Sequence, residues 1–316
     1  FGGVIGGTGA LGALTINAAS DSQTGDADIA ILDIGDSDTV GAAATNIGNT
    51  NTELITLSGT TFKHGAAVYT TKGADVIKLT RTAGAGNATF TLSNASLEFA
   101  GGNIKLSDGV DLVANTGNKA LTVLGVRGTS YEDVTLTTTG TLTVGTGGIG
   151  SGTQIEDVSL DGTSIVLKGN ITTAGATVGN TNNVGDVDFD GAVTIDGAVT
   201  ITTDVDGSTV NDGKIDFATN TINAEGTATD SLTLTSGSGT ITLGGAVGGT
   251  TGLSSLAVNA TALNLAANIT TANGLIDINA PVTLTGTNLV VSSGTGTGNV
   301  DFSSTISGNK DLDILS

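Results

Sequence analysis

Apolar and polar residues alternate along most of this chain, in short segments of about four to six residues. Segments such as 134–136, 141–144 and 231–234 place an apolar side chain at every second position. Because successive side chains of a strand point to opposite faces, a period of two predicts strands with one face inward. Glycine, asparagine and aspartate separate the segments, and no stretch has the spacing of an amphipathic helix.

The strand-like segments recur far along the sequence. Residues 1–18 return as 243–260, and part of that motif returns again as 302–315. The segment 131–136 returns as 155–160, and 155–171 matches 253–269. Self-similarity of this kind is typical of solenoids. The sequence therefore predicts an all-β fold, a right-handed parallel β-helix with coils of roughly 20–24 residues and two or three strands, spanning 1–316 as one elongated solenoid.

The alternation also predicts which side chains form the interior. Ten apolar residues of the best-repeated part are expected to point inward in stacked columns, and burying each contributes roughly 1.5–3 kcal/mol. They are Leu253, Leu256, Val258, Leu263, Leu265, Ile269, Ile276, Ile278, Val282 and Leu284.

An up-and-down barrel or a β-sandwich is the competing interpretation, since both are built from short alternating strands. Both folds need tight hairpins, and the sequence holds a single Asn-Gly pair, Asn273-Gly274. Neither fold explains matches between segments so far apart in the sequence, so the solenoid is favoured.

Residues 60–128 differ from the rest of the chain, because the repeat is weakest there. We interpret them as diverged coils, with a lateral insertion or a contact surface as alternatives. They hold His64, seven of the ten basic residues and four of the nine aromatic residues. The basic residues are Lys63, Lys72, Lys78, Arg81, Lys105, Lys119 and Arg127, and the aromatic ones are Phe62, Tyr69, Phe90 and Phe99.

Composition narrows the function. The net charge of −20 argues against nucleic-acid binding and against anionic membrane surfaces. No apolar run reaches the length of a membrane span. Cysteine is absent, which is compatible with secretion without disulfides. Methionine is also absent, so we expect a trimmed chain or a segment of a longer product.

Two acidic segments are candidate Ca²⁺ sites. Asp186, Asp188 and Asp190 match the start of a calcium-binding loop, and Asp204, Asp206 and Asp212 match a second one. Both segments lack the glutamate at position twelve, and a solvated acidic strand is the alternative. Carboxylates in stacked strands repel one another unless a cation lies between them, and oxygen ligands favour Ca²⁺. We therefore predict at least one Ca²⁺ site among these six residues.

Catalytic chemistry has few candidate residues. His64 is the only histidine and cysteine is absent, which nearly excludes zinc and leaves a serine triad without a visible nucleophile motif. A polysaccharide-processing β-helix could act with carboxylates alone, but tryptophan is absent and only two tyrosines could form sugar platforms. We predict that the protein is no enzyme, with no catalytic residues and no cofactor other than Ca²⁺.

The glycine-rich motif at 1–18 and 243–260, followed by Asn-Ile-Thr-Thr at 170–173 and 268–271, resembles repeats of filamentous-haemagglutinin-like adhesins and related giant bacterial β-solenoid surface proteins. The resemblance covers 1–20 and about 130–316. It implies an exported protein at the bacterial cell surface that acts as an adhesin, filament or sheath component. It supplies no catalytic residues.

These observations predict a structural subunit of an extracellular fibre. Phe1 and Phe302 occupy matching motif positions, and no cap is visible at either end. An uncapped coil is adhesive, so the expected partner is the chain itself, either as a head-to-tail homopolymer or as the continuation of a longer solenoid. The alternatives are a surface adhesin stalk, for which 60–128 is the candidate tip, and the polysaccharide-processing enzyme.

Overall fold

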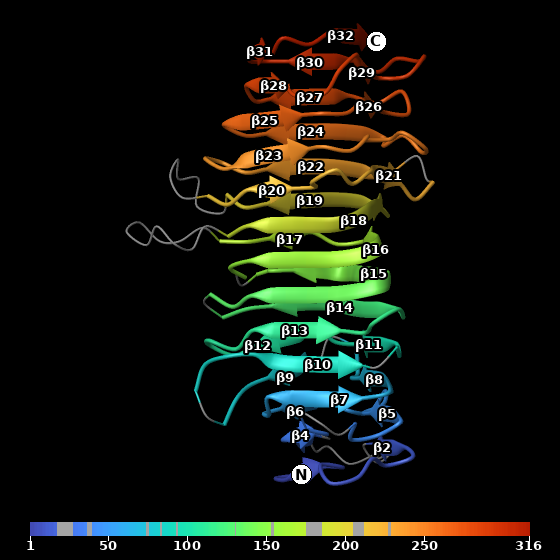
Figure 1. Cartoon of the computed structure of the whole chain (residues 1–316), viewed down its shortest axis with the longest axis vertical. Coiled ribbons are helices and arrows are strands. Elements are labelled where there is room, and N and C mark those ends of the chain that lie inside the picture. The colour runs from blue at the N-terminus through green and yellow to red at the C-terminus, as the bar shows by residue number, and fades with distance from the viewer. Residues whose placement is uncertain are drawn as a thin grey trace. The chain divides into compact units, whose positions relative to one another are not determined.

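A computed structural model describes residues 1–17, 28–36, 40–73, 76–82, 84–92, 94–129, 131–152, 155–174, 185–204, 212–226 and 229–316. The chain is a parallel β-solenoid of about 11 turns, as the alternation predicted, and the described residues contain no helix. It forms two compact units, Phe1–Ile155 and Glu156–Ser316. Within each unit, strands of successive coils lie one above the other (Figure 1).

The first unit contains fifteen of the described strands. They are β1 (Val4–Ile5), β2 (Leu14–Ile16), β3 (Asp28–Ile31), β4 (Asp33–Ile34), β5 (Ala44–Ile47), β6 (Leu54–Leu57), β7 (Thr61–His64), β8 (Ala66–Thr70), β9 (Val76–Leu79), β10 (Ala88–Leu92), β11 (Leu97–Ala100), β12 (Ile104–Leu106), β13 (Leu112–Asn115), β14 (Leu121–Arg127) and β15 (Val134–Ile149).

The second unit contains the other seventeen. They are β16 (Val158–Leu167), β17 (Ile171–Thr172), β18 (Val187–Ile195), β19 (Ala198–Thr202), β20 (Ile215–Asp216), β21 (Ile222–Ala224), β22 (Ser231–Thr235), β23 (Thr240–Leu243), β24 (Ser255–Asn259), β25 (Ala262–Leu265), β26 (Ile269–Thr270), β27 (Ile276–Asn279), β28 (Val282–Leu284), β29 (Leu289–Ser292), β30 (Val300–Phe302), β31 (Ile306–Ser307) and β32 (Leu312–Leu315).

Each turn of the coil contributes to three ladders of parallel strands. In the first unit, ladder 1 runs through β1, β4, β7, β10, β13 and β15. Ladder 2 runs through β2, β5, β8, β11, β14 and β15. Ladder 3 runs through β3, β6, β9, β12 and β14. Up to β13, consecutive strands belong to different ladders and every third strand pairs, whereas the longer strands β14 and β15 each join two ladders.

The second unit repeats the arrangement. Ladder 1 runs through β16, β18, β20, β23, β25, β28 and β31. Ladder 2 runs from β18 through β21 and an isolated bridge at Val247 to β26, β29 and β32. Ladder 3 runs through β17, β19, β22, β24, β27 and β30. β16 and β18 are long because they turn a corner without breaking. At that corner Gly191 has φ +154°, and a Cβ there would lie 1.6 Å from the Gly162 carbonyl oxygen, so only glycine fits.

The interior is predicted correctly from the alternation. All ten residues named for the core are buried. Their columns follow the strand register. In one column Leu232 pairs with Leu256, and Leu256 pairs with Ile276 on the next coil. In another, Ile241 pairs with Leu263, and Leu263 pairs with Val282. Each coil thus covers the apolar side chains of the one before it, which is what a stack of half-buried strands requires.

The coil length is more variable than predicted. A short coil joins Leu263 to its register partner Val282, whereas a much longer one joins Ala198 to its partner Ser231. The paired strands of these two coils have similar lengths, and the segments between them absorb the difference. This variation is tolerated because loops lie outside the ladder hydrogen bonds.

Residues 60–128 form strands β7 to β14, which pair in register with the neighbouring coils of the first unit. The four aromatic side chains of this region point into the coil. Phe62, Tyr69, Phe90 and Phe99 are all buried, and Phe90 contacts the other three rings. They form the core of these coils and are not surface residues for recognising a ligand.

Buried hydroxyl groups close several corners of the second unit. These hydroxyl groups directly follow strands of ladder 3. After β19 the Thr203 hydroxyl donates to the Gly213 carbonyl at 2.6 Å, and after β22 the Ser236 hydroxyl donates to the Gly239 carbonyl at 2.9 Å. Thr173 makes the corresponding bond to the Gly185 carbonyl one coil earlier. The hydroxyl satisfies a carbonyl that would otherwise be buried without a partner. The bond also holds the start of one coil against the end of the previous one.

Candidate functional site

The predicted acidic strand lies in ladder 1 of the second unit. Asp188 on β18 pairs in register with Asp216 on β20, and both point outward. The Lys214 ammonium lies 2.5 Å from Asp188 Oδ1 and 3.8 Å from Asp216 Oδ2. Burial lowers the pKa of Lys214, but the hydrogen bond and charge of Asp188 outweigh it and raise the pKa. A lysine therefore occupies the position between these carboxylates where a cation was expected.

Asp186 lies just before β18, and its carboxylate accepts a hydrogen bond from the backbone. Its Oδ1 accepts the Lys214 backbone N–H at 2.9 Å, and its own N–H donates to Asp157 Oδ1 at 2.7 Å. The same chain of contacts therefore runs across three consecutive coils. These carboxylates satisfy backbone donors at a corner of the coil, where strand ladders provide no partner.

Asp190 faces a second carboxylate. It pairs in register with Asp161 of β16, and the two lie on adjacent coils. Burial raises the pKa of Asp161, and the neighbouring charge of Asp190 raises it further. Among the described residues, no basic side chain forms an ion pair with either one. This pair keeps the uncompensated repulsion that the sequence interpretation expected for stacked acids.

The remaining calcium candidates fall at the next corner. Asp212 is buried, and its Oδ2 accepts the Ser238 backbone N–H at 2.7 Å while its own N–H donates to the Ser238 hydroxyl at 2.9 Å. Asp204 follows β19, and its backbone carbonyl accepts a hydrogen bond from Thr202. Asp206 lies outside the described residues.

Within the described ranges, the structure brings together no group of three or more acidic or histidine side chains in a geometry that could hold a metal ion. Aspartates are instead distributed one by one along the corners of successive coils. Asp33 Oδ1 accepts the backbone N–H groups of Thr60 and Thr61 at 2.7 and 2.8 Å, and Asp230 Oδ1 accepts that of Gly197 at 2.8 Å. Calcium binding by the six residues stays a prediction that needs a binding measurement.

His64 is a core residue of the first unit. Its Nε2 lies 2.8 Å from the Tyr69 hydroxyl, and its Nδ1 lies 3.2 Å from the Gly65 carbonyl. An N–H at Nδ1 satisfies that carbonyl and leaves Nε2 to accept from the tyrosine, which is the neutral form. Burial lowers the pKa of His64 to about 4 and raises that of Tyr69. The imidazole thus pairs with a phenol inside the aromatic core.

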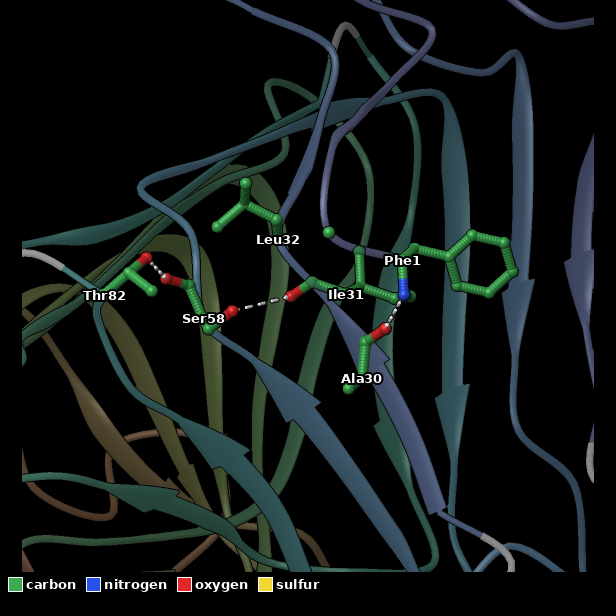
Figure 2. Close-up of a pocket in the computed structure, with 7 residues that line it drawn as sticks. Phe1, Ala30, Ile31, Leu32, Ser58 and Thr82 are labelled. Atoms are coloured by element: carbon green, nitrogen blue, oxygen red, sulfur yellow. Dashed lines mark hydrogen bonds between the residues drawn. The ribbon is translucent and has the colours of Figure 1, made fainter.

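A hollow of about 480 Å³ lies beside the first coils. The residues that line it include Phe1, Ala30, Leu32, Ser58 and Thr82, and Figure 2 shows hydrogen bonds between several of the lining residues. The Phe1 ammonium donates to the Ala30 carbonyl at 2.9 Å, and the Thr82 hydroxyl donates to the Ser58 carbonyl at 3.1 Å. The described residues that line the hollow include no titratable side chain.

The surface feature that sequence reasoning missed is a column of basic residues. Lys78 of β9 pairs in register with Lys105 of β12, and Lys105 pairs with Arg127 of β14. All three side chains are exposed on ladder 3 of the first unit. The enrichment of basic residues in 60–128 was the available signal. Their uneven spacing in the sequence concealed the alignment, because the coils here differ in length.

Comparisons with known protein families, with curated proteins and with solved structures give no match. The resemblance to giant bacterial surface proteins therefore rests on the quoted motifs alone, while the parallel β-solenoid of repeated coils is established by the structure. The described residues include no helix long and apolar enough to cross a lipid bilayer.

Proposed function

We propose that this protein is a structural subunit of an extracellular fibre at the bacterial cell surface, in which one coil stacks on another from end to end. The β-solenoid fold is compatible with a surface fibre or an adhesin stalk. A fibre subunit needs a repeated, self-supporting surface and no reaction centre. The sole histidine in the aromatic core and the aspartates used by backbone donors support a mechanical role over a catalytic one.

The observation that carries the proposal is that the apolar columns run without interruption from coil to coil, so that a further β-coil can extend them. Ile306 continues the column above Val282, and Ile314 continues the column above Val291. Their exposed fractions are 38% and 48%, whereas the residues beneath them are almost fully buried. Ladder strands at this end also have backbone groups with no neighbour on one side. An apolar face with a free strand edge is covered most simply by another β-coil.

The first coil presents a similar face. Phe1, Val4 and Leu11 are exposed large apolar residues, with Phe1 exposed to 66%. Stacking the last coil of one solenoid onto the first coil of another is a head-to-tail contact, which repeats without closing and so produces a filament. The partner coil belongs to a second copy or to a longer solenoid of which these coils are a part.

Electron microscopy and light scattering of the isolated chain test the proposal. Native protein is expected to grow filaments with concentration, and the variant carrying Ile306→Lys and Ile314→Lys is expected to remain monomeric, because two ammonium groups would be buried in the joint. The matched control carries Thr305→Lys and Ser307→Lys, which flank Ile306 and point outward. It should still polymerise.

A native monomer that resists concentration, with both end coils exposed, would refute polymerisation of this chain. Filaments that grow equally well from the Ile306→Lys and Ile314→Lys variant would show that growth uses another surface.

A further inference from the structure

The basic column consists of Lys78, Lys105 and Arg127, which stand in register on three successive coils of the first unit. Adjacent strands of a sheet lie about 4.8 Å apart, so three positive side chains follow one another at that spacing. Like charges placed directly opposite on neighbouring strands are unfavourable. Thr56, the register neighbour on the preceding coil, is uncharged and gives no relief.

No carboxylate within the described ranges forms an ion pair with these three residues. Two of the three lysines of the second unit behave differently. Lys168 lies 2.6 Å from Asp196 Oδ2, and Lys214 lies 2.5 Å from Asp188 Oδ1, each across adjacent coils. The fold can therefore place a carboxylate beside a lysine on the next coil, but it does not do so in the basic column.

The acidic counterpart is the pair of Asp161 and Asp190. These two carboxylates also stand on adjacent strands, at the same spacing as the cations, and in the described part of the chain they too have no basic partner. Burial raises the pKa of Asp161, and the charge of Asp190 beside it raises that pKa further. The chain thus carries an unneutralised column of each sign.

The charges of the two regions make a contact between copies favourable. Residues 60–128 carry seven basic and four acidic side chains, whereas residues 156–316 carry three basic and seventeen acidic ones. Two identical chains of net charge −20 repel each other in most orientations. A staggered side-by-side arrangement that sets the positive region of one against the negative region of another is the exception.

We propose that Lys78, Lys105 and Arg127 form a lateral docking surface for a second copy of this chain, whose Asp161 and Asp190 they contact. Because both columns have the spacing of stacked strands, successive charges meet in register without rearrangement of the backbone. This lateral contact is independent of end-to-end stacking and would bundle single solenoids or filaments alike.

Charge exchange tests the contact. One variant carries Lys78→Glu, Lys105→Glu and Arg127→Glu, a second carries Asp161→Lys and Asp190→Lys, and a third carries all five substitutions. Capture of labelled soluble protein by surface-tethered copies of the same variant is measured at low and high salt. Circular dichroism verifies that each variant is folded.

Native capture is expected to weaken with salt, and each single-column variant should bind itself about tenfold or more weakly than native protein. The five-substitution variant should recover self-capture, because the exchanged columns are again opposite in sign. A control with Lys72→Glu, Lys119→Glu and Lys310→Glu has the same net charge as the basic-column variant but leaves the column intact, so it should lose clearly less self-capture than that variant.

Absence of native capture, or native-like capture by the basic-column variant, overturns the proposal. Failure of the five-substitution variant to recover also overturns it. A linear polyanion, probed with dextran sulfate, is the other possible occupant. Column-dependent binding of dextran sulfate without self-capture assigns the column to such a polymer and rejects the second copy. None of the five column substitutions lies in the end coils, so filament length measured separately distinguishes this outcome from failure of end-to-end stacking.

Discussion

The two units share one architecture but stabilise it with different chemistry. The first unit fills its coils between 60 and 128 with stacked and edge-on rings of Phe62, Tyr69, Phe90 and Phe99. The second relies on columns of leucine, isoleucine and valine, with one stacked pair among its described residues, Phe189 and Phe217. The coil geometry thus constrains which positions face inward, and it accepts any apolar side chain that fills the space there.

The surfaces differ in the same way. The second unit pairs Lys168 and Lys214 with aspartates of adjacent coils, whereas the first stacks three cations without an ion pair in the described part of the chain. In both units packing requires an apolar side chain at each inward position, whereas the charge of an outward side chain is not determined by the fold. The apolar inward residues are therefore required by the fold, and the charged outward residues are available for interactions.

The largest expected effect comes from a charge placed in the core of the second unit. Leu256→Asp should cost about 4 kcal/mol or more, because it removes a buried side chain and buries a carboxylate without a partner. Both tyrosines lie in the first unit and tryptophan is absent, so tyrosine fluorescence reports on that unit. Circular dichroism in urea should show early loss of strands in the second unit.

Ala257→Asp is the control, since Ala257 is the adjacent outward position on β24. A Leu256→Asp variant that unfolds at the same urea concentration as the control would mean that the register of ladder 3 is wrong.

A smaller effect, confined to the first unit, is expected from pH. The pKa of His64 falls from 6.5 to about 4 on folding, so the unfolded chain binds a proton in this range and the folded one does not. The contribution of neutral His64 is complete above pH 6.5 and is lost as pH falls toward 4, by about 3 kcal/mol in total.

The His64→Gln variant separates the contribution of His64 to stability from that of the carboxylates, because the carboxylates titrate in both proteins. The unfolding free energy, followed by tyrosine fluorescence between pH 7 and 4.5, should fall more steeply for the native protein. Parallel pH profiles for the two proteins would exclude the buried neutral imidazole.

A third prediction concerns Ca²⁺ and the second unit. If Asp186, Asp188, Asp190, Asp204, Asp206 and Asp212 include a site, Ca²⁺ at a hundred times its Kd should stabilise the folded chain by about 2.7 kcal/mol. Thermal melting at low salt with and without a chelator measures the effect. An unchanged midpoint would reject the site and leave Lys214 as the cation of this acidic strand.

The smallest effects should have opposite signs in the two units. Lys214→Ala should destabilise by about 0.2–1 kcal/mol, the usual range for an exposed ion pair. Lys78→Ala should be neutral or stabilising by a few tenths of a kcal/mol, because it relieves repulsion within the basic column. Urea titrations of dilute protein at low salt compare the two. Equal losses of stability would contradict the contrast between paired and unpaired lysines.

The sequence predicted the burial pattern better than the geometry of the coil. A period of two identifies inward residues on any ladder, and for this reason all ten predicted core residues are buried. It does not identify which ladder a strand joins. The match of 155–171 with 253–269 equates Val158, a residue of ladder 1, with Leu256, a residue of ladder 3.

The residues matched between 243–260 and 302–315 differ both in ladder and in burial. It equates Leu256, which is buried on ladder 3, with Leu315, which is exposed and pairs with Ser292 on ladder 2. The glycine and β-branched residues of the motif suit every corner and every strand. Such a motif therefore repeats in sequence without repeating in position.

The candidate site was less predictable because its residues depend on loop lengths. The sequence identified the crowding of aspartates but not that Lys214 lies between Asp188 and Asp216. Likewise, the members of the basic column are unevenly spaced along the chain, so they have no fixed period to detect. Side-chain alignment across coils becomes visible only when the ladder register is known.

The buried hydroxyl bonds at the corners have a consequence for how such a chain can change over time. The bond from Thr173 to Gly185 encloses a long segment, whereas the equivalent bond from Ser236 to Gly239 encloses a tight turn. The same closure therefore serves corners whose enclosed segments differ in length. A corner fastened in this way separates the length of the segment it encloses from the alignment of the coils on either side. A longer segment at such a corner adds only the slowly growing entropy of loop closure, so these corners are where we expect a foreign peptide to be grafted with the least disturbance of the stack.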